Sequence, residues 1–331
     1  MFDKYPDIDD KITKTVGLMY PLELNDQLID TTMDSNLSII NPEEEKVATD
    51  YLKECLKKHH MARNSGISYV RYTHNGLSRS RLSFDALESF EDLALSIRIL
   101  TGRKCECLLY ASCNEQVSPT YYYNVFDFLE GKDLYLFPEE KSIVFNDEDI
   151  KSLKRIYQKI VSNSPFRGSQ EYSRLKNALD FFNKSYDPQW FLLKVTLLFT
   201  VLESIFSEDS YEISYKISLR TAYFLYRDQQ DLRKKTFEFL RLGYNMRSEF
   251  VHGGKVDTIK KEKKLASIRG VDHYSIMFDY PNDLYELVRK VLYGIILDED
   301  VFKMVSEKNK EDSYKVFLDN IALDTKDPLK S

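Results

Sequence analysis

The pattern of apolar and polar positions first becomes regular at residue 41, where it predicts a helix. Asn41 is followed by Pro42 and three glutamates, a series typical of an N-cap, a first helical position and the positive end of the helix dipole. Apolar residues then recur at helical spacing to about residue 59. Residues 84–100, FDALESFEDLALSIRIL, predict a second amphipathic helix. Residues 1–40 show weak periodicity and predict no definite element.

Between residues 104 and 137 the pattern changes to short runs. KCECLLYA, TYYYNVFDFL and KDLYLF are aromatic or alternating, and Pro, Gly and Asn lie between them. Such runs predict strands or extended segments. Helical spacing resumes at 148–161, and NSPFRGSQ at 163–170 is typical of a junction. We therefore place a domain boundary between residues 164 and 165.

The chain beyond this junction is predicted to be almost wholly helical. The expected helices lie near 169–184, 188–207, 211–228, 230–252 and 281–297, with shorter ones to about residue 320. The apolar run FLLKVTLLFTVL at 191–202 is too short for a membrane span and carries Lys194, so it predicts a buried helix. The predicted fold class is mainly α, with a helical bundle over 165–331 and an N-terminal α or α+β domain over 1–164.

The amino-acid composition also bears on solubility and on cellular location. The 331 residues are 43% apolar and 30% charged, enough to bury a sizeable core. The four cysteines are too few for a disulfide scaffold, and MFDKYPDIDD has no apolar segment of a signal peptide. These features predict a soluble, cytoplasmic protein without a membrane partner.

The cysteines were also considered as metal ligands. Cys105, Cys107 and Cys113 follow the spacing C-x-C-x5-C, which lacks a convincing fourth ligand. We expect a cysteine-bearing strand here, with neither a metal nor another cofactor.

Charge is distributed unevenly along the chain. The net charge of −6 argues mildly against nucleic acid, but residues 233–264 carry ten Lys or Arg against four acids, which leaves −12 for the rest. A local excess of this kind is typical of an electrostatic footprint. The segment KVDTIKKEKK within it is predicted to be either a solvated, mobile loop or an arm that binds an RNA backbone. Its lysines are Lys255, Lys260, Lys261, Lys263 and Lys264.

The stretch YNMRSEFVHGG, residues 244–254, carries the candidate chemistry. On a helix, an apolar face is shared by Phe237, Leu240, Tyr244 and Val251. Arg247 lies at the edge of this face, where its charge needs a partner or water. His252 precedes two glycines, the usual left-handed cap, and so lies at the negative end of the dipole.

The spacing of Arg247 and His252 has a geometric consequence. Five residues correspond to about 140° of rotation, so the two side chains do not meet on one helix. They are expected to flank a groove or to be completed by groups from elsewhere. Spacing alone also fits an ordinary cationic helix end.

With this spacing the stretch resembles the R-x4-H motif of HEPN domains, small α-helical domains that are often metal-independent ribonucleases, and more closely the ApeA-like HEPN group. LLFTVLESIFS at 197–207 is similar to the helix with the family's acidic residue, here Glu203. EISYKISLRTAYFL is similar to the next helix, with Arg220. LRLGYNMRSEFVHGG matches the motif helix and PNDLYELVRKVL the closing helix. Roughly residues 170–297 are covered, and Ser248 stands where members often have Asn, Asp or His.

The resemblance implies RNA cleavage by attack of the 2′-hydroxyl on the adjacent phosphate. His252 would transfer protons, and Arg247 would donate to phosphate oxygens, with Ser248 and Glu203 completing the site. Glu203 would hold Arg247, orient His252, or form a buried structural pair with an arginine. Arg220 and the lysines of KVDTIKKEKK would bind the RNA.

The resemblance also implies a homodimer that faces two motifs across one cleft; the alternative is a monomer in which Glu203 and Arg220 complete the site within one chain. It further implies a role in antiviral defence or as a toxin. The N-terminal domain would then sense a phage or another trigger. The alternatives are a non-catalytic HEPN-fold module that binds RNA or a protein, and an antitoxin-like or scaffold protein.

Overall fold

The computed structural model forms two compact units, Met1–Ser162 and Asn163–Ser331. The division lies beside the boundary predicted at 164/165. The residues described are 14–20, 22, 31–58, 68–73, 79–103, 105–113, 143–166, 173–186, 190–208, 211–254, 257–306 and 311–322.

The N-terminal unit contains an antiparallel sheet. Its strands are β1 (Lys14–Tyr20), β2 (Leu37–Ile40), β3 (Ser68–Thr73) and β4 (Glu106–Cys113), in the order β2-β3-β1-β4. The strand predicted in KCECLLYA is therefore confirmed as β4, whereas TYYYNVFDFL and KDLYLF lie outside the described residues. Two of the four strands, β1 and β2, fall in the stretch where the sequence pattern predicted nothing definite.

Helices accompany this sheet. The 3-10 turn η1 (Pro42–Glu45) leads into α1 (Lys46–Lys58), and α2 (Arg79–Thr101) and α3 (Asp147–Ser162) follow. The predicted N-cap is confirmed, because the Asn41 side chain accepts from the Glu43 amide at 3.1 Å and the Glu44 carboxylate accepts from the Asn41 amide at 3.2 Å. Helix α2 packs on the sheet so closely that a Cβ at Gly17 would lie 2.7 Å from the Phe90 ring. The N-terminal unit is thus α+β.

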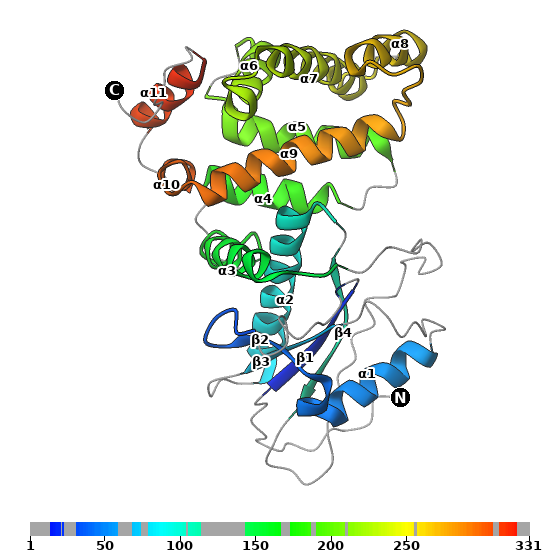
Figure 1. Cartoon of the computed structure of the whole chain (residues 1–331), viewed down its shortest axis with the longest axis vertical. Helices are drawn as coiled ribbons and strands as arrows, with labels where there is room; N and C mark the ends of the chain where they lie inside the picture. The colour runs from blue at the N-terminus through cyan, green and yellow to red at the C-terminus, as the bar shows by residue number, and fades with distance from the viewer. Residues whose placement is uncertain are drawn as a thin grey trace. The chain divides into compact units, whose positions relative to one another are not determined.

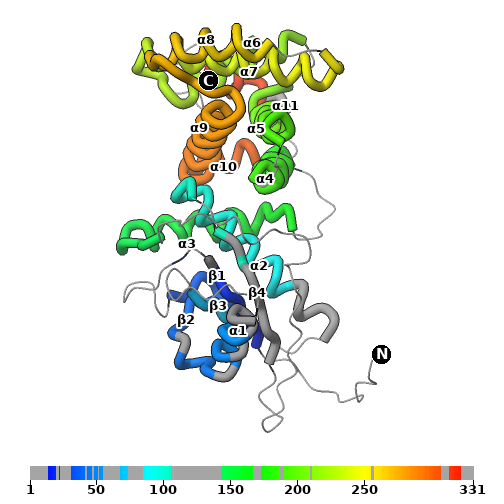
Figure 2. Tube along the Cα trace, turned by 90° about the vertical axis from the view of Figure 1, so that its right-hand side faces the viewer, coloured from blue at the N-terminus to red at the C-terminus, as the bar shows by residue number. Residues whose placement is uncertain are grey.

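The C-terminal unit is helical. Its helices are α4 (Arg174–Lys184), α5 (Phe191–Phe206), α6 (Ile213–Tyr226), α7 (Gln230–Val251), α8 (Thr258–Arg269), α9 (Asp279–Leu297), α10 (Glu299–Ser306) and α11 (Glu311–Ala322). Helices α6, α7 and α8 form one layer and α4, α5 and α9 the other (Figures 1 and 2). The mainly α fold class is confirmed. Among the described helices, none combines the length and apolar character that a membrane crossing requires.

The approach of α7 to α5 and α9 positions the candidate site. Gly243 lies inside α7, and a Cβ there would fall 1.5 Å from the Tyr280 hydroxyl oxygen of α9 and 3.0 Å from the Phe199 ring of α5. Only a residue without a side chain lets the fully buried Tyr280 ring lie under α7. This close approach brings the last turns of α7 against α5.

Candidate functional site

Helix α7 ends as the sequence predicts. Gly253 has φ +72°, the left-handed conformation, and His252 is the cap residue. The Gly254 amide donates to the Glu249 carbonyl at 2.6 Å and the Gly253 amide to the Phe250 carbonyl at 3.1 Å. These are the two bonds of a Schellman motif. The motif fixes the chain beyond the helix and leaves His252 exposed at the helix end.

Arg247 is held by the helix that lies across from it. Its Nη2 donates to the Glu203 carboxylate of α5 at 3.1 Å, and its Nη1 donates to the Tyr244 hydroxyl at 3.3 Å. The Arg247 and Glu203 side chains are 22% and 20% exposed. Glu203 therefore holds Arg247, which is one of the roles that the sequence left open.

The guanidinium of Arg247 retains unused hydrogen-bonding capacity. Its Nε is buried and has no hydrogen-bond partner among the residues that the structure describes. A guanidinium carries five N–H donors in a planar fork, and a buried donor without a partner is costly. The buried Nε does not itself meet a ligand. Part of the side chain reaches solvent, however, and the second N–H groups of Nη1 and Nη2 are the donors available to an anionic ligand.

Tyr244, which the sequence places only on the apolar face and at a partly buried seam, is a third member of this cluster. Its hydroxyl donates to the Glu203 carboxylate at 2.9 Å, and its ring lies edge-on to Phe199 with centroids 5.5 Å apart. Burial first, and then the charge and hydrogen bond of Glu203, raise the pKa of Tyr244 to about 12. The hydroxyl therefore stays protonated near neutral pH and fixes the carboxylate that holds Arg247.

Ser248 and His252 lie outside this hydrogen-bonded cluster. Neither the Ser248 hydroxyl nor the His252 imidazole has a side-chain hydrogen bond within the described part of the chain. Glu203 accordingly orients Arg247 and not His252. One chain presents a held arginine and an exposed histidine on the same helix end, without a direct link between them.

Apolar side chains surround this helix end. Trp190, at the start of α5, contacts Phe250 of α7 edge-on with ring centroids 4.7 Å apart. Trp190, Leu193 and Val251 are 54%, 42% and 51% exposed. The prediction that Val251 shares the buried face of α7 is therefore wrong. We refer to Trp190, Leu193 and Val251 as the apolar rim of the site.

The basic segment has a different form from the one predicted. Residues 258–269 are helix α8, capped by the Asp257 side chain, which accepts from the Lys260 amide at 3.2 Å. Lys260, Lys263 and Lys264 are exposed on it. Lys255 lies outside the described residues.

Two predicted RNA ligands are engaged within the protein instead. Lys261 is buried, and its ammonium donates to the Glu249 carboxylate of α7, so it anchors α8 to the motif helix. Arg220 is buried too. Its Nη1 and Nη2 form a bidentate pair with the Glu208 carboxylate, in which the Nη2 donor lies 2.9 Å from the acceptor oxygen. Nη1 also donates to the Phe206 carbonyl at 2.8 Å. Both assignments to RNA binding are corrected, because a buried and paired cation does not reach a phosphate.

Cysteines of the N-terminal unit lie in its core, where Cys105 and Cys107 are buried. Among the described residues, no group of three or more His, Cys, Asp or Glu is placed to hold a metal ion. Comparisons of the chain with models of protein families, with curated proteins and with solved structures found no match.

Proposed function

We propose that residues 165–331 form a HEPN-type domain that cleaves RNA without a metal ion, with Arg247 and His252 as its catalytic residues. The observation that carries the proposal is the arrangement at the end of α7. Arg247 is half-buried and held by Glu203 but has an unpartnered Nε, and an exposed His252 caps the same helix. The order of the helix segments, from Glu203 to the motif helix, supports it.

The proposed step needs only the chain and the RNA. His252 accepts the proton of a ribose 2′-hydroxyl, and the oxygen attacks the adjacent phosphorus. Arg247 donates to the phosphate oxygens as negative charge builds up on them. The bond from phosphorus to the 5′-oxygen then breaks, that oxygen takes up a proton from water, and the His252 imidazolium releases its proton to water. The products are a 2′,3′-cyclic phosphate and a 5′-hydroxyl.

Incubation of the pure protein with mixed cellular RNA and a chelator tests this function. We expect cleavage in the presence of the chelator and fragments that end in 2′,3′-cyclic phosphate. A strict requirement for magnesium, or fragments with 3′-hydroxyl ends, would contradict the proposal. The N-terminal unit would, on this proposal, sense a phage or another trigger and restrain the cleavage.

A second candidate is a non-catalytic module that binds RNA or a protein. The observation that favours it is the lack of a hydrogen bond from His252 to the Arg247 cluster within the described residues. In the same assay such a module retains RNA and leaves it intact. A filter-binding measurement run beside the cleavage assay distinguishes the two.

The exposed lysines of α8 carry a separate prediction. Replacing Lys260, Lys263 and Lys264 by alanine should weaken RNA binding, because these side chains lie on a helix anchored to α7 through Lys261 and Glu249. Each lost contact to a single-strand phosphate lowers the slope of log affinity against log salt by about 0.7. The slope of the triple variant should therefore be smaller than that of the wild type by up to about 2. RNA titrations at several salt concentrations measure both slopes.

The control for this prediction is a variant with the same loss of charge elsewhere. Lys234, Lys303 and Lys315 are exposed on α7, α10 and α11, and their replacement should leave the slope near that of the wild type. Equal slopes for the two triple variants would show that α8 does not contact RNA.

We further propose a homodimer with a shared site, because the held arginine and the exposed histidine do not meet in one chain. The apolar rim is suited to be the seam, since two-fold contacts are self-complementary. Light scattering should give twice the 39.0 kDa chain mass. Trp190 is the chain's single tryptophan, so its emission should shift to longer wavelength on dilution as the seam opens.

Two variants test the shared site. Leu193→Asp should yield a monomer with little activity, whereas Val316→Asp, at an equally exposed position on α11, should stay dimeric. An excess of the inactive Arg247→Ala/His252→Ala chain should depress wild-type activity beyond dilution once subunits exchange. A monomeric mass with activity proportional to the wild-type chain would rule out the shared site.

A further inference from the structure

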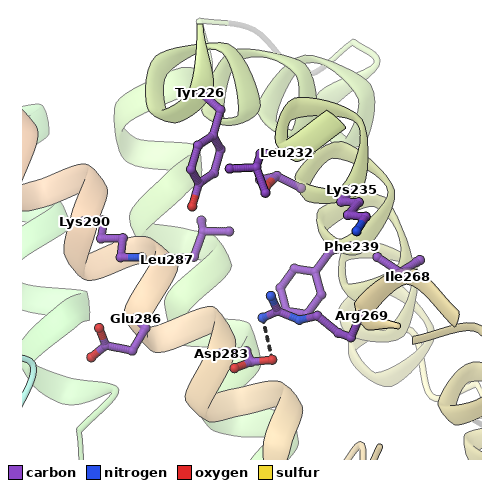
Figure 3. A pocket seen from close by; sticks show the side chains of 11 residues that line it. Tyr226, Leu232, Lys235, Phe239, Ile268, Arg269, Asp283, Glu286, Leu287 and Lys290 are labelled. Atoms are coloured by element: carbon purple, nitrogen blue, oxygen red, sulfur yellow. Dashed lines mark ion pairs between the residues drawn. The ribbon is translucent and has the colours of Figure 1, made fainter. Parts of the chain in front are cut away.

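The C-terminal unit contains a cavity that none of the candidate RNA-site residues lines. Its volume is about 340 Å³, and its walls come from the end of α6, the first half of α7, the end of α8 and α9 (Figure 3). Lys235 on its wall and Arg247 lie twelve residues apart on α7, which is about 18 Å along the helix. The cavity is therefore a different site from the one at the end of α7.

The acidic side chains of the cavity are already paired. Arg269 forms an ion pair with Asp283 (Figure 3), and the Tyr274 hydroxyl donates to Asp283 at 2.7 Å. Glu286 accepts from Arg289 at 3.0 Å. Neither carboxylate is left as an uncompensated charge that attracts a cation.

Besides the Thr236 hydroxyl, which can donate or accept, three further polar groups of the lining can donate hydrogen bonds. Lys235 and Lys290 are exposed, and neither ammonium has a partner among the described residues. The Tyr226 side chain points into the cavity (Figure 3), and its hydroxyl has no partner in the described part of the chain either. Two cations and a hydroxyl around one cavity favour an anion that accepts several hydrogen bonds.

The rest of the wall is apolar. Phe239 and Ile268 are buried, and Leu232 and Leu287 complete this part of the lining. The Arg269 guanidinium lies over the Phe239 ring, 4.8 Å from its centroid, so this side of the cavity is a flat, amphipathic surface. Small-molecule sites combine such apolar walls with a few polar groups, and their volumes begin at about 300 Å³. The cavity volume suits a molecule of one or two rings.

We propose that this cavity binds a phosphate carried on a planar ring, with the ring against the apolar wall. The long, exposed side chains of Lys235 and Lys290 lie on opposite sides of the cavity (Figure 3) and turn inward to the phosphate when it binds. The Tyr226 hydroxyl donates to the same phosphate. This chemistry is shared by a free mononucleotide and by the end of an RNA strand. The proposal does not depend on cleavage at Arg247 and His252, because no residue serves both sites.

Calorimetric titration of the full chain tests the proposal with phenyl phosphate, adenosine 5′-monophosphate and inorganic phosphate as probes. We expect at least one ring-bearing phosphate to bind with one molecule per chain and inorganic phosphate to bind more weakly. Lys235→Ala/Lys290→Ala should weaken that binding about tenfold or more, and Tyr226→Phe about threefold. The control Lys234→Ala/Lys303→Ala removes the same charge from exposed positions outside the cavity and should not weaken it.

The result that overturns the proposal is an absence of binding by all three probes at millimolar concentration, or equal binding by the two double variants. Binding of inorganic phosphate as tight as that of the ring-bearing probes would overturn the role of the apolar wall. Displacement of a bound ring-bearing probe by a short RNA carrying a 5′-phosphate would identify the strand end as the source of the ligand. Retention of the probe would identify a free small molecule.

Discussion

Replacing His252 by alanine is expected to remove RNA cleavage while leaving the protein folded. A positioned general base or acid contributes about 10²–10⁴ to a rate, and the rate of chelator-resistant cleavage should fall by that factor. The imidazole is exposed at the cap of α7. Surface substitutions of this kind change stability by less than about 0.5 kcal/mol, so the melting temperature should move by about 2 °C or less.

Arg247→Ala should lower the rate by about 10²–10³, the usual effect of losing one donor to a developing negative charge. Its melting temperature should fall more than that of His252→Ala, since the half-buried Glu203 carboxylate loses its cation and keeps only Tyr244. Gel assays of a defined RNA under single-turnover conditions measure both rates.

Matched variants show whether these effects belong to the site. Arg241→Ala removes an exposed arginine of the same helix, and His273→Ala removes an exposed histidine of the same unit. Both should cleave RNA at the wild-type rate. Full activity in His252→Ala, or an equal loss in Arg241→Ala and Arg247→Ala, would contradict the assignment of the catalytic residues.

The helices of the C-terminal unit are largely predictable because their apolar residues follow a helical period. Helix α8 is the exception. Its buried apolar side chains gather at one end, at Leu265, Ala266 and Ile268, while Ile259 near its start is exposed and Lys261 is buried between them. The methylene groups of Lys261 take the place of an apolar side chain, and its ammonium pairs with Glu249. The sequence of this segment therefore shows no apolar stripe, and its charged pattern favoured a loop or an arm.

Strand β1 of the N-terminal unit was missed for a related reason. Residues 15–19 of β1 are all buried, because β1 lies inside the sheet and α2 packs against it. A strand buried on both faces shows no alternation, and a short apolar run does not distinguish a strand from a helix. The strand predicted in KCECLLYA shows that short runs bounded by other residue types can still be recognised.

The candidate site shows where sequence reasoning reaches its limit. The rotation of α7 correctly predicts an arginine at the edge of the core, and the two glycines predict the cap. Which acid holds that arginine depends on the approach of α5, and Tyr244 acquires its role only from that approach. Arg220 was assigned to RNA by the family resemblance alone. Its burial and its pairing with Glu208 and the distant Asp319 depend on how the helices pack.

Gly243→Ala is expected to cause a large loss of stability for a substitution that adds a single methyl group. The new Cβ would lie 1.5 Å from the Tyr280 hydroxyl oxygen, 2.4 Å from its Cζ and 3.0 Å from the Phe199 ring. Tyr280 cannot move aside freely, since it is fully buried and stacks on Phe239 with ring centroids 4.5 Å apart. Overpacking of a core costs about 1–3 kcal/mol and sometimes more, and an overlap of this size belongs at the upper end.

The higher helix propensity of alanine offsets part of this loss of stability. Inside a helix it is favoured over glycine by about 1 kcal/mol, so the net loss of unfolding free energy should be about 2 kcal/mol or more. For a unit of this size the melting temperature should fall by about 4–8 °C. Gly294→Ala is the control, because its Cβ would meet only the Phe224 ring, at 3.2 Å, and it should stay close to wild type in thermal and urea unfolding.

Tyr280→Phe provides the test that the loss arises at this contact. It removes the oxygen that lies nearest to the new Cβ, although the ring carbon at 2.4 Å remains. Gly243→Ala should therefore cost less in the Tyr280→Phe background than in the wild type, and the difference is the coupling energy of a double-mutant cycle. RNA cleavage should fall with Gly243→Ala as well, because a displaced α7 no longer brings Arg247 to Glu203. Wild-type stability of Gly243→Ala, or equal costs in both backgrounds, would show that α7 does not pack on Tyr280 and that another contact positions Arg247.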